Sequence, residues 1–119
     1  ANIRRYTLAT GHKAWIHRLA APAFVCAFAD LEAWIAKHSS WAPGVVQSLC
    51  FRHIRWDPKR ALSNHSRGAA LDIDPDTNAA RTEGEIPEEA GSILEAWGIH
   101  WGRRWVSYLD PMHFEYAQK

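Results

Sequence analysis

The chain has 119 residues, of which 47% are hydrophobic and 23% are charged, so it is long enough for one globular domain with its own core and excludes intrinsic disorder. A net charge of +1 gives no reason to expect a nucleic-acid partner, and no apolar run reaches the roughly 18 residues that a membrane helix needs. We therefore expect a single domain over residues 1–119 that works as a monomer, outside the membrane.

The chain begins with Ala-Asn-Ile-Arg-Arg, without an initiator Met and without the apolar stretch and cleavage site of a signal peptide. This start suggests a processed or excised fragment. The chain has two cysteines, Cys26 and Cys50. Sequence alone leaves their pairing open, although two isolated cysteines are more often small buried hydrophobic residues than a disulfide.

The first half of the chain contains a predicted helix and two predicted strands. Apolar residues recur at helical spacing over residues 22–39, which predicts a helix. Residues 45–55 are rich in β-branched and aromatic side chains and predict a strand. After a loop-like stretch, residues 69–73 fit a short buried strand, and the polar segment 75–87 fits a long loop.

The second half contains a second amphipathic helix, predicted over residues 88–97 with Gly98 at its C-terminal end. Further strands are expected at residues 105–108 and 112–116, the latter because its polar and apolar residues alternate. Helices and short separated strands together predict an α+β fold, with a small antiparallel sheet flanked by helices.

Two of the histidines have acidic residues at a spacing that could serve a metal. His65 and Asp72 bracket a run of small residues across which two backbone segments can approach closely, and Asp110 precedes His113 near the end of the chain. Two imidazoles and one carboxylate would leave a fourth tetrahedral position for water, as in catalytic zinc sites. The spacing alone fits equally well a salt-bridged loop with hydrogen-bonded histidines, so the residues leave both interpretations open.

Three motifs follow one another in the last part of the chain: Ser63-x-His65-x-x-Gly68-x-Ala70-x-Asp72, Trp101-Gly102 and Asp110-Pro-Met-His113-Phe-Glu115. In order and residue type they resemble the zinc D-alanyl-D-alanine carboxypeptidase (VanY-like) family. That family also takes in L-alanyl-D-glutamate peptidases of phage endolysins and of sporulating bacteria. The resemblance implies a hedgehog/DD-peptidase-like zinc fold.

The resemblance also implies roles for individual residues. Asp110 takes the place of the general base, and Ser63 and Glu115 are read as supports that orient the metal ligands without touching the metal. One zinc ion is expected, with three protein ligands: His65, Asp72 and His113.

Several side chains are candidates for contact with the substrate. Arg52 matches the arginine that holds the substrate and polarises its scissile carbonyl, although Arg55 lies close enough in the sequence to take that role. Arg67 stands where an aromatic residue is frequent in the family, which bears on the side chains that the cleft accepts. Trp101 is a further candidate for the cleft.

The function implied by the resemblance is zinc-dependent hydrolysis of peptide bonds in the stem peptides of bacterial peptidoglycan. The bond is either L-Ala-D-Glu, as for an endopeptidase, or D-Ala-D-Ala, as for a carboxypeptidase. The small domain and the residues of its motifs look more like those of phage lysins, which favours the endopeptidase. Such an enzyme would act on the bacterial cell wall after phage-lysin-type release or as a processed secreted protein. The chain would then be the catalytic domain excised from a longer cell-wall lysin.

Two other classes of function stay open. One is a non-catalytic zinc-containing binding module of the same fold, as in the related hedgehog signalling domain. Asp110 argues against it, because an inert module needs no base beside the metal. The other is a metal-free structural protein.

Overall fold

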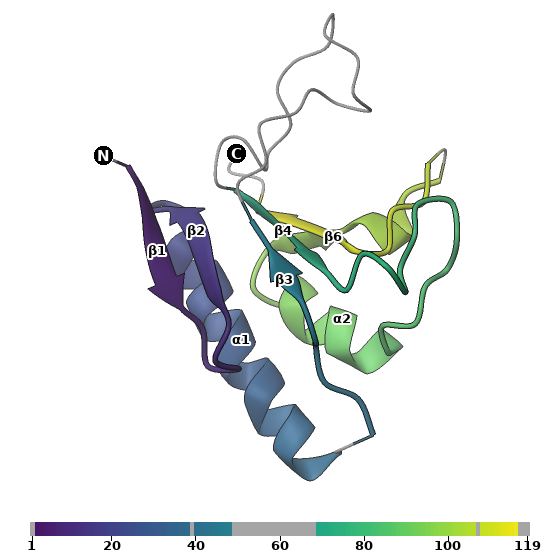
Figure 1. Cartoon of the computed structure of the whole chain (residues 1–119), viewed down its shortest axis with the longest axis horizontal. Coiled ribbons are helices and arrows are strands. Elements are labelled where there is room, and N and C mark those ends of the chain that lie inside the picture. The colour runs from purple at the N-terminus through teal and green to yellow at the C-terminus, as the bar shows by residue number, and fades with distance from the viewer. Residues whose placement is uncertain (1, 39, 49–68, 107, 117–119) are drawn as a thin grey trace, which may run out of the picture.

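The computed structural model describes residues 2–38, 40–48, 69–106 and 108–116 (Figure 1). This part of the chain folds into a two-stranded hairpin, two helices and a four-stranded antiparallel sheet, which confirms the expected α+β class. None of its helices is long and apolar enough to span a membrane. The elements in chain order are β1 (Ile3–Thr7), β2 (Lys13–His17), α1 (Ala21–Lys37), β3 (Val46–Gln47), β4 (Ala70–Ile73), α2 (Glu88–Glu95), β5 (Ile99–Trp101), the 3-10 turn η2 (Gly102–Arg104) and β6 (His113–Tyr116).

The N-terminal hairpin β1–β2, for which no element was predicted, lies across α1 (Figure 1). Its turn depends on Gly11, which has a φ of 91° and donates a backbone hydrogen bond to Leu8 O at 2.8 Å. From β2, Ala14 and Ile16 are fully buried in the core. The alternate residues of β2 therefore lie on the opposite face of the hairpin.

The first helix, α1, runs from Ala21 to Lys37 and confirms the prediction over residues 22–39. A proline in its first turn suits the helix start, where its missing N–H costs nothing, and Phe24 and Phe28 are buried one helical turn apart. Cys26 is exposed on this helix, so the expectation of a buried cysteine is wrong for this residue. Cys50 lies outside the described residues.

The four-stranded sheet has the order β3-β4-β6-β5, with every neighbouring pair antiparallel. Side chains alternate between its two faces. Leu71 and Phe114 point into the core, where α2 packs through Ala90 and Leu94. The other face carries the polar residues of β4 and β6.

The strand predictions are confirmed at residues 69–73 and 112–116, which contain β4 and β6. The predicted strand over residues 45–55 is observed as β3 at its beginning, and residues 49–55 lie outside the described part of the chain. The prediction of a strand over residues 105–108 is wrong for its described residues 105, 106 and 108, because the strand in this region is β5, before η2. The backbone N–H of Asp110 donates to Gly102 O at 3.1 Å, which brings Asp110 next to the start of η2.

The segment predicted as a loop over residues 75–87 contains no helix or strand. The buried side chain of Asn78 organises it, since Nδ2 donates to Asp74 O at 3.0 Å and Oδ1 accepts from the N–H groups of Glu85 and Ile86 at 2.6 and 3.1 Å. This loop also packs on the chain near β6, because the N–H of Arg81 donates to Leu109 O at 2.6 Å. It therefore supports the segment that precedes His113.

The second helix, α2, packs closely on β5 at Gly91, where a Cβ would lie 2.2–2.7 Å from three ring atoms of Trp101.

Replacing Gly91 by Ala is expected to lower the free energy of unfolding by about 2 kcal/mol, because the cost of overpacking exceeds the gain of about 1 kcal/mol in helix propensity. Urea denaturation measures this change. Ser92→Ala, at the exposed neighbouring position, is the control and should change stability by less than about 0.5 kcal/mol. A Gly91→Ala variant at least as stable as the original chain would contradict the packing described.

Candidate metal centre and active site

Asp72 on β4 and His113 on β6 face each other across the sheet. Directly after this pair, the N–H of Ile73 donates to Met112 O at 2.9 Å, which makes Asp72–His113 a non-hydrogen-bonded pair. At such positions the opposing side chains come closest. The Nδ1 atom of His113 lies 3.3 Å from Oδ1 of Asp72, and the two residues are only 5% and 6% exposed. The sheet register therefore brings these two predicted ligands together.

Glu115 forms a hydrogen bond with the other nitrogen of the same imidazole. It lies two residues after His113 on the same face of β6, and its Oε1 is 2.6 Å from His113 Nε2. Burial by itself lowers the pKa of His113, but the hydrogen bonds and charges of Asp72 and Glu115 together outweigh it and raise that pKa to about 9. Without a metal, the imidazole is therefore protonated at neutral pH.

A tight turn places Asp110 just before His113. The N–H of His113 donates to Asp110 O at 3.0 Å, with Pro111 at the second position of the turn, which proline favours. Gly102 permits this arrangement, since a Cβ there would lie 2.2 Å from Asp110 O. From the core, Trp101 Nε1 donates to Pro111 O at 2.7 Å. The half-buried Asp110 is thus fixed next to the sheet strand that carries His113.

Trp101 does not line a substrate cleft, contrary to the expectation from the sequence. It pairs with Phe114 on the core face of the sheet, stacks on that ring at 5.5 Å between centroids, and is 1% exposed. The guanidinium carbons of Arg103 and Arg104 lie over the indole ring of Trp101, at 5.4 and 4.9 Å from its centroid. Trp101 therefore supports the turn from Asp110 to His113 on its core side.

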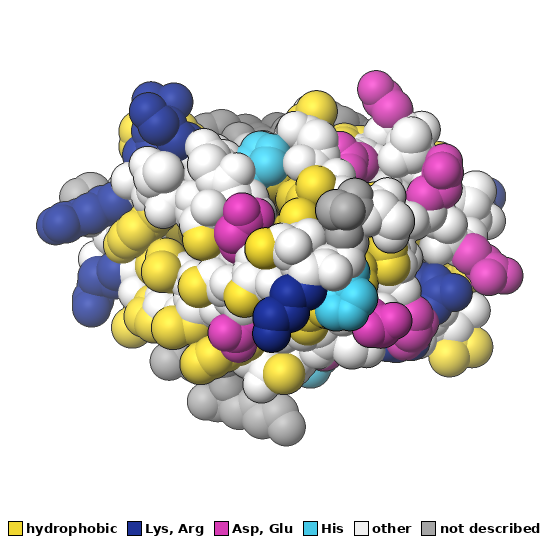
Figure 2. All heavy atoms as spheres, turned by 90° about the horizontal axis from the view of Figure 1, so that it is seen from below, with side chains coloured by type: hydrophobic (Ala, Val, Ile, Leu, Met, Phe, Trp, Pro, Cys, Tyr) yellow, Lys and Arg dark blue, Asp and Glu magenta, His cyan; other side chains and the backbone are white. Residues whose placement is uncertain are grey.

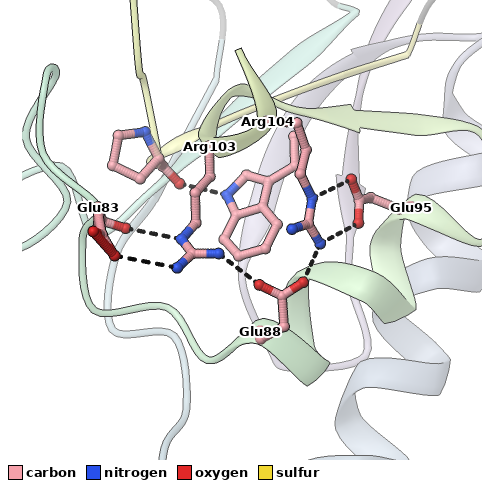
Figure 3. A network of polar contacts seen from close by, with 7 residues as sticks. Glu83, Glu88, Glu95, Arg103 and Arg104 are labelled. Atoms are coloured by element: carbon pink, nitrogen blue, oxygen red, sulfur yellow. Dashed lines mark hydrogen bonds and ion pairs between the residues drawn. The ribbon is translucent and has the colours of Figure 1, made fainter. Parts of the chain in front are cut away.

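A network of ion pairs ties η2 to α2 around this tryptophan (Figure 3). Glu88 accepts from both Arg103 and Arg104, and Glu95 receives two hydrogen bonds from Arg104, at 3.0 and 2.9 Å. The hydrogen bond of Glu88 to Arg104 lowers the pKa of this carboxyl group. These four side chains are partly exposed, and their ion pairs join η2 to α2.

Sequence reasoning missed one residue beside the site, Trp105. Its ring lies 5.3 Å from that of His113, tilted by 51°, and it is half-buried. The sequence prediction placed Trp105 in a strand, where successive side chains point to opposite faces of a sheet. It therefore gave no reason to expect a contact between Trp105 and His113. Trp105 instead follows η2 directly, and its ring covers one side of the His113 imidazole.

The structure brings together four of the predicted site residues, Asp72, Asp110, His113 and Glu115. Apart from Trp101, which is buried in the core, the others predicted for the site lie outside the described residues: Arg52, Arg55, Ser63, His65 and Arg67. Within residues 2–38, 40–48, 69–106 and 108–116, no group of three His, Cys, Asp or Glu residues is arranged to hold a metal. The described part therefore supplies a pair of candidate ligands, Asp72 and His113.

The donor atoms of this pair fit a tetrahedral metal. Zinc bonds of about 2.0–2.1 Å to nitrogen and oxygen place two ligand atoms roughly 3.3–3.4 Å apart at tetrahedral angles. Nδ1 of His113 and Oδ1 of Asp72 are 3.3 Å apart. Histidine ligands also commonly donate their second N–H to a carboxylate, which is the position of Glu115.

Comparison with known proteins agrees with the motifs. A family model described as D-alanyl-D-alanine carboxypeptidase matches residues 56–116, just over half of the chain. The chain belongs to this peptidase family. Neither the comparison with curated proteins nor that with solved structures yields a match.

The matched range contains the motifs from Ser63 to Glu115 and the strands β4, β5 and β6. Arg52, the candidate for binding the scissile carbonyl, precedes it. The hairpin β1–β2 and helix α1 also lie before the region that matches the carboxypeptidase family.

Proposed function

We propose that the chain is a zinc-dependent peptidase that cleaves the stem peptides of bacterial peptidoglycan. The observation that carries this proposal is the buried Asp72–His113 pair, whose donor atoms are spaced as for tetrahedral zinc and whose imidazole is oriented by Glu115. Membership of a peptidase family agrees with it. His65 is proposed as the third ligand, in a hedgehog/DD-peptidase-like fold.

The reaction needs a base, an oriented substrate and stabilisation of the oxyanion. Zinc, when bound, supplies a water of lowered pKa and a positive charge. Asp110, held by its turn three residues before His113, accepts a proton from the attacking water and returns it to the leaving amine. Arg52 is proposed to bind the scissile carbonyl, with Arg55 as the other candidate, because a guanidinium stabilises the charge that develops there.

The bond proposed for cleavage is L-Ala-D-Glu, with D-Ala-D-Ala as the other candidate, because the small domain and its motifs look more like those of phage lysins. The chain would then act on the bacterial cell wall as the catalytic domain of a lysin. Mass spectrometry of muropeptides distinguishes the two specificities. An endopeptidase leaves fragments with a new N-terminal D-Glu, whereas a carboxypeptidase releases free D-alanine.

Removal of the metal tests the proposal as a whole. Turnover of purified peptidoglycan should fall more than about 100-fold after dialysis against a chelator, because the metal generates the nucleophile, and one equivalent of zinc should restore it. Amino groups released from the wall measure the turnover. Turnover that survives complete removal of the metal would exclude zinc catalysis, and zinc-dependent binding without any turnover would favour the non-catalytic module.

A further inference from the structure

The N-terminal hairpin has a polar and aromatic face that points away from the core. Because Ala14 and Ile16 are buried, their neighbours Lys13 and Trp15 project from the opposite side. Trp15 is 46% exposed, so a large part of its indole is open to a ligand.

The strand register places cations beside this indole. Arg5 pairs with Trp15 and Thr7 with Lys13. The backbone hydrogen bond from Leu8 N to His12 O, at 2.7 Å, gives these odd-numbered pairs the non-hydrogen-bonded geometry, in which facing side chains lie closest. Among the described residues, neither Arg5 nor Lys13 forms an ion pair.

The charged side chains of residues 1–29 are all positive. No Asp or Glu precedes Asp30, although the same stretch contains several cations: Arg4, Arg5, Lys13 and Arg18. The residues before Asp30 therefore carry four positive side chains and no negative one, whereas the whole chain has a net charge of only +1. In Figure 2, Lys and Arg side chains gather beside hydrophobic ones at the left-hand end, where the hairpin lies, and most acidic side chains lie towards the other end.

Strand β3 connects this face with the candidate active site. The N–H of Trp15 donates to Ser48 Oγ at 2.8 Å, and the preceding residue, Gln47, pairs with Asp72. The hairpin and the sheet also share one hydrophobic core. Two surfaces therefore turn away from that core: the outer face of the hairpin and the sheet face that carries Asp72. Strand β3 contacts both the hairpin and β4.

We propose that the outer face of the hairpin, formed by Arg5, Lys13 and Trp15, binds an anionic polysaccharide. The exposed indole offers a flat apolar surface for a sugar ring, and the two cations pair with acidic groups along the polymer. The choice of a polysaccharide over an anionic lipid surface rests on the proposed function, because a polymer of the cell wall would reach both the hairpin and the peptidase site.

Binding of soluble hyaluronate, an acidic polysaccharide without peptides, tests this proposal by calorimetry on the full zinc-loaded chain. The original chain should bind hyaluronate more weakly as salt rises, and should not bind uncharged dextran. Lys13→Gln should weaken binding about 2- to 5-fold and Trp15→Thr about 3- to 10-fold. Lys37→Gln removes an exposed cation at the end of α1 and should leave the affinity unchanged.

Three outcomes would overturn the inference: no binding of hyaluronate, equal binding by all the variants, or binding to phosphatidylglycerol vesicles in place of the polysaccharide. Cleavage of a short soluble stem peptide separates this inference from the proposed function. The hairpin variants should cleave that peptide as fast as the original chain does. If the original chain binds hyaluronate but cleaves no stem peptide, the peptidase proposal fails and the polysaccharide site stands.

Discussion

Replacing Asp110 by Asn is expected to lower peptidoglycan turnover by about 10³-fold, within the range for loss of a general base. The amide cannot accept the proton of the attacking water. The turn should persist, because it is made by backbone atoms, through the hydrogen bonds of Asp110 to His113 and Gly102. Zinc content and the unfolding midpoint should therefore match those of the original chain, while the release of amino groups from the wall falls.

The matched control for this variant is Asp76→Asn, which neutralises an exposed carboxylate in the loop between β4 and α2. It should leave turnover unchanged. If Asp110→Asn retains more than about a tenth of the activity, another residue is the base. If it loses zinc along with activity, Asp110 contributes to the metal site and the division of roles proposed here is wrong.

Replacing His113 by Ala is expected to weaken zinc binding by more than about 100-fold, the upper end of the effects seen on loss of residues that only orient ligands. It should also destabilise the zinc-free protein by about 3 kcal/mol, because it removes the imidazole that forms an ion pair with the buried carboxylate of Asp72. Titration with zinc and urea denaturation measure the two effects. His100→Ala removes an exposed imidazole that lies opposite Glu115 in the sheet, and should preserve both zinc affinity and stability.

The pH dependence of stability gives a further readout for the same variant. Because folding raises the pKa of His113 from 6.5 to about 9, its contribution to the stability of the zinc-free protein is complete below pH 6.5 and is lost as pH rises through about 9. The original chain should lose about 3 kcal/mol over this window, and His113→Ala should lack this loss. An equal pH dependence in both proteins would show that the imidazole is not held between the two carboxylates.

Local patterns in the chain were enough to predict both helices and the two strands that carry the candidate ligands. Helical spacing of Phe24, Phe28 and Leu31 predicts α1, because a helix buries one stripe of side chains. Alternation around Phe114 predicts β6, because a strand buries every second side chain. The spacing of Asp72, Asp110 and His113 left a metal site and a salt-bridged loop equally open, and the zinc interpretation came from the resemblance to the carboxypeptidase family.

Contacts between distant segments could not be obtained in this way. Whether Asp72 meets His113, 41 residues later, depends on the register of β4 against β6, and a shift of one residue would send one of the two side chains into the core. The burial of Trp101 depends on the space left at Gly91 of another element. The exposed face of the hairpin, with Arg5 beside Trp15, exists only because β1 and β2 pair and turn their other face to the core. Residue types thus set the chemistry available to this chain, and packing decided which side chains meet, since strand register and burial are cooperative properties of the whole fold.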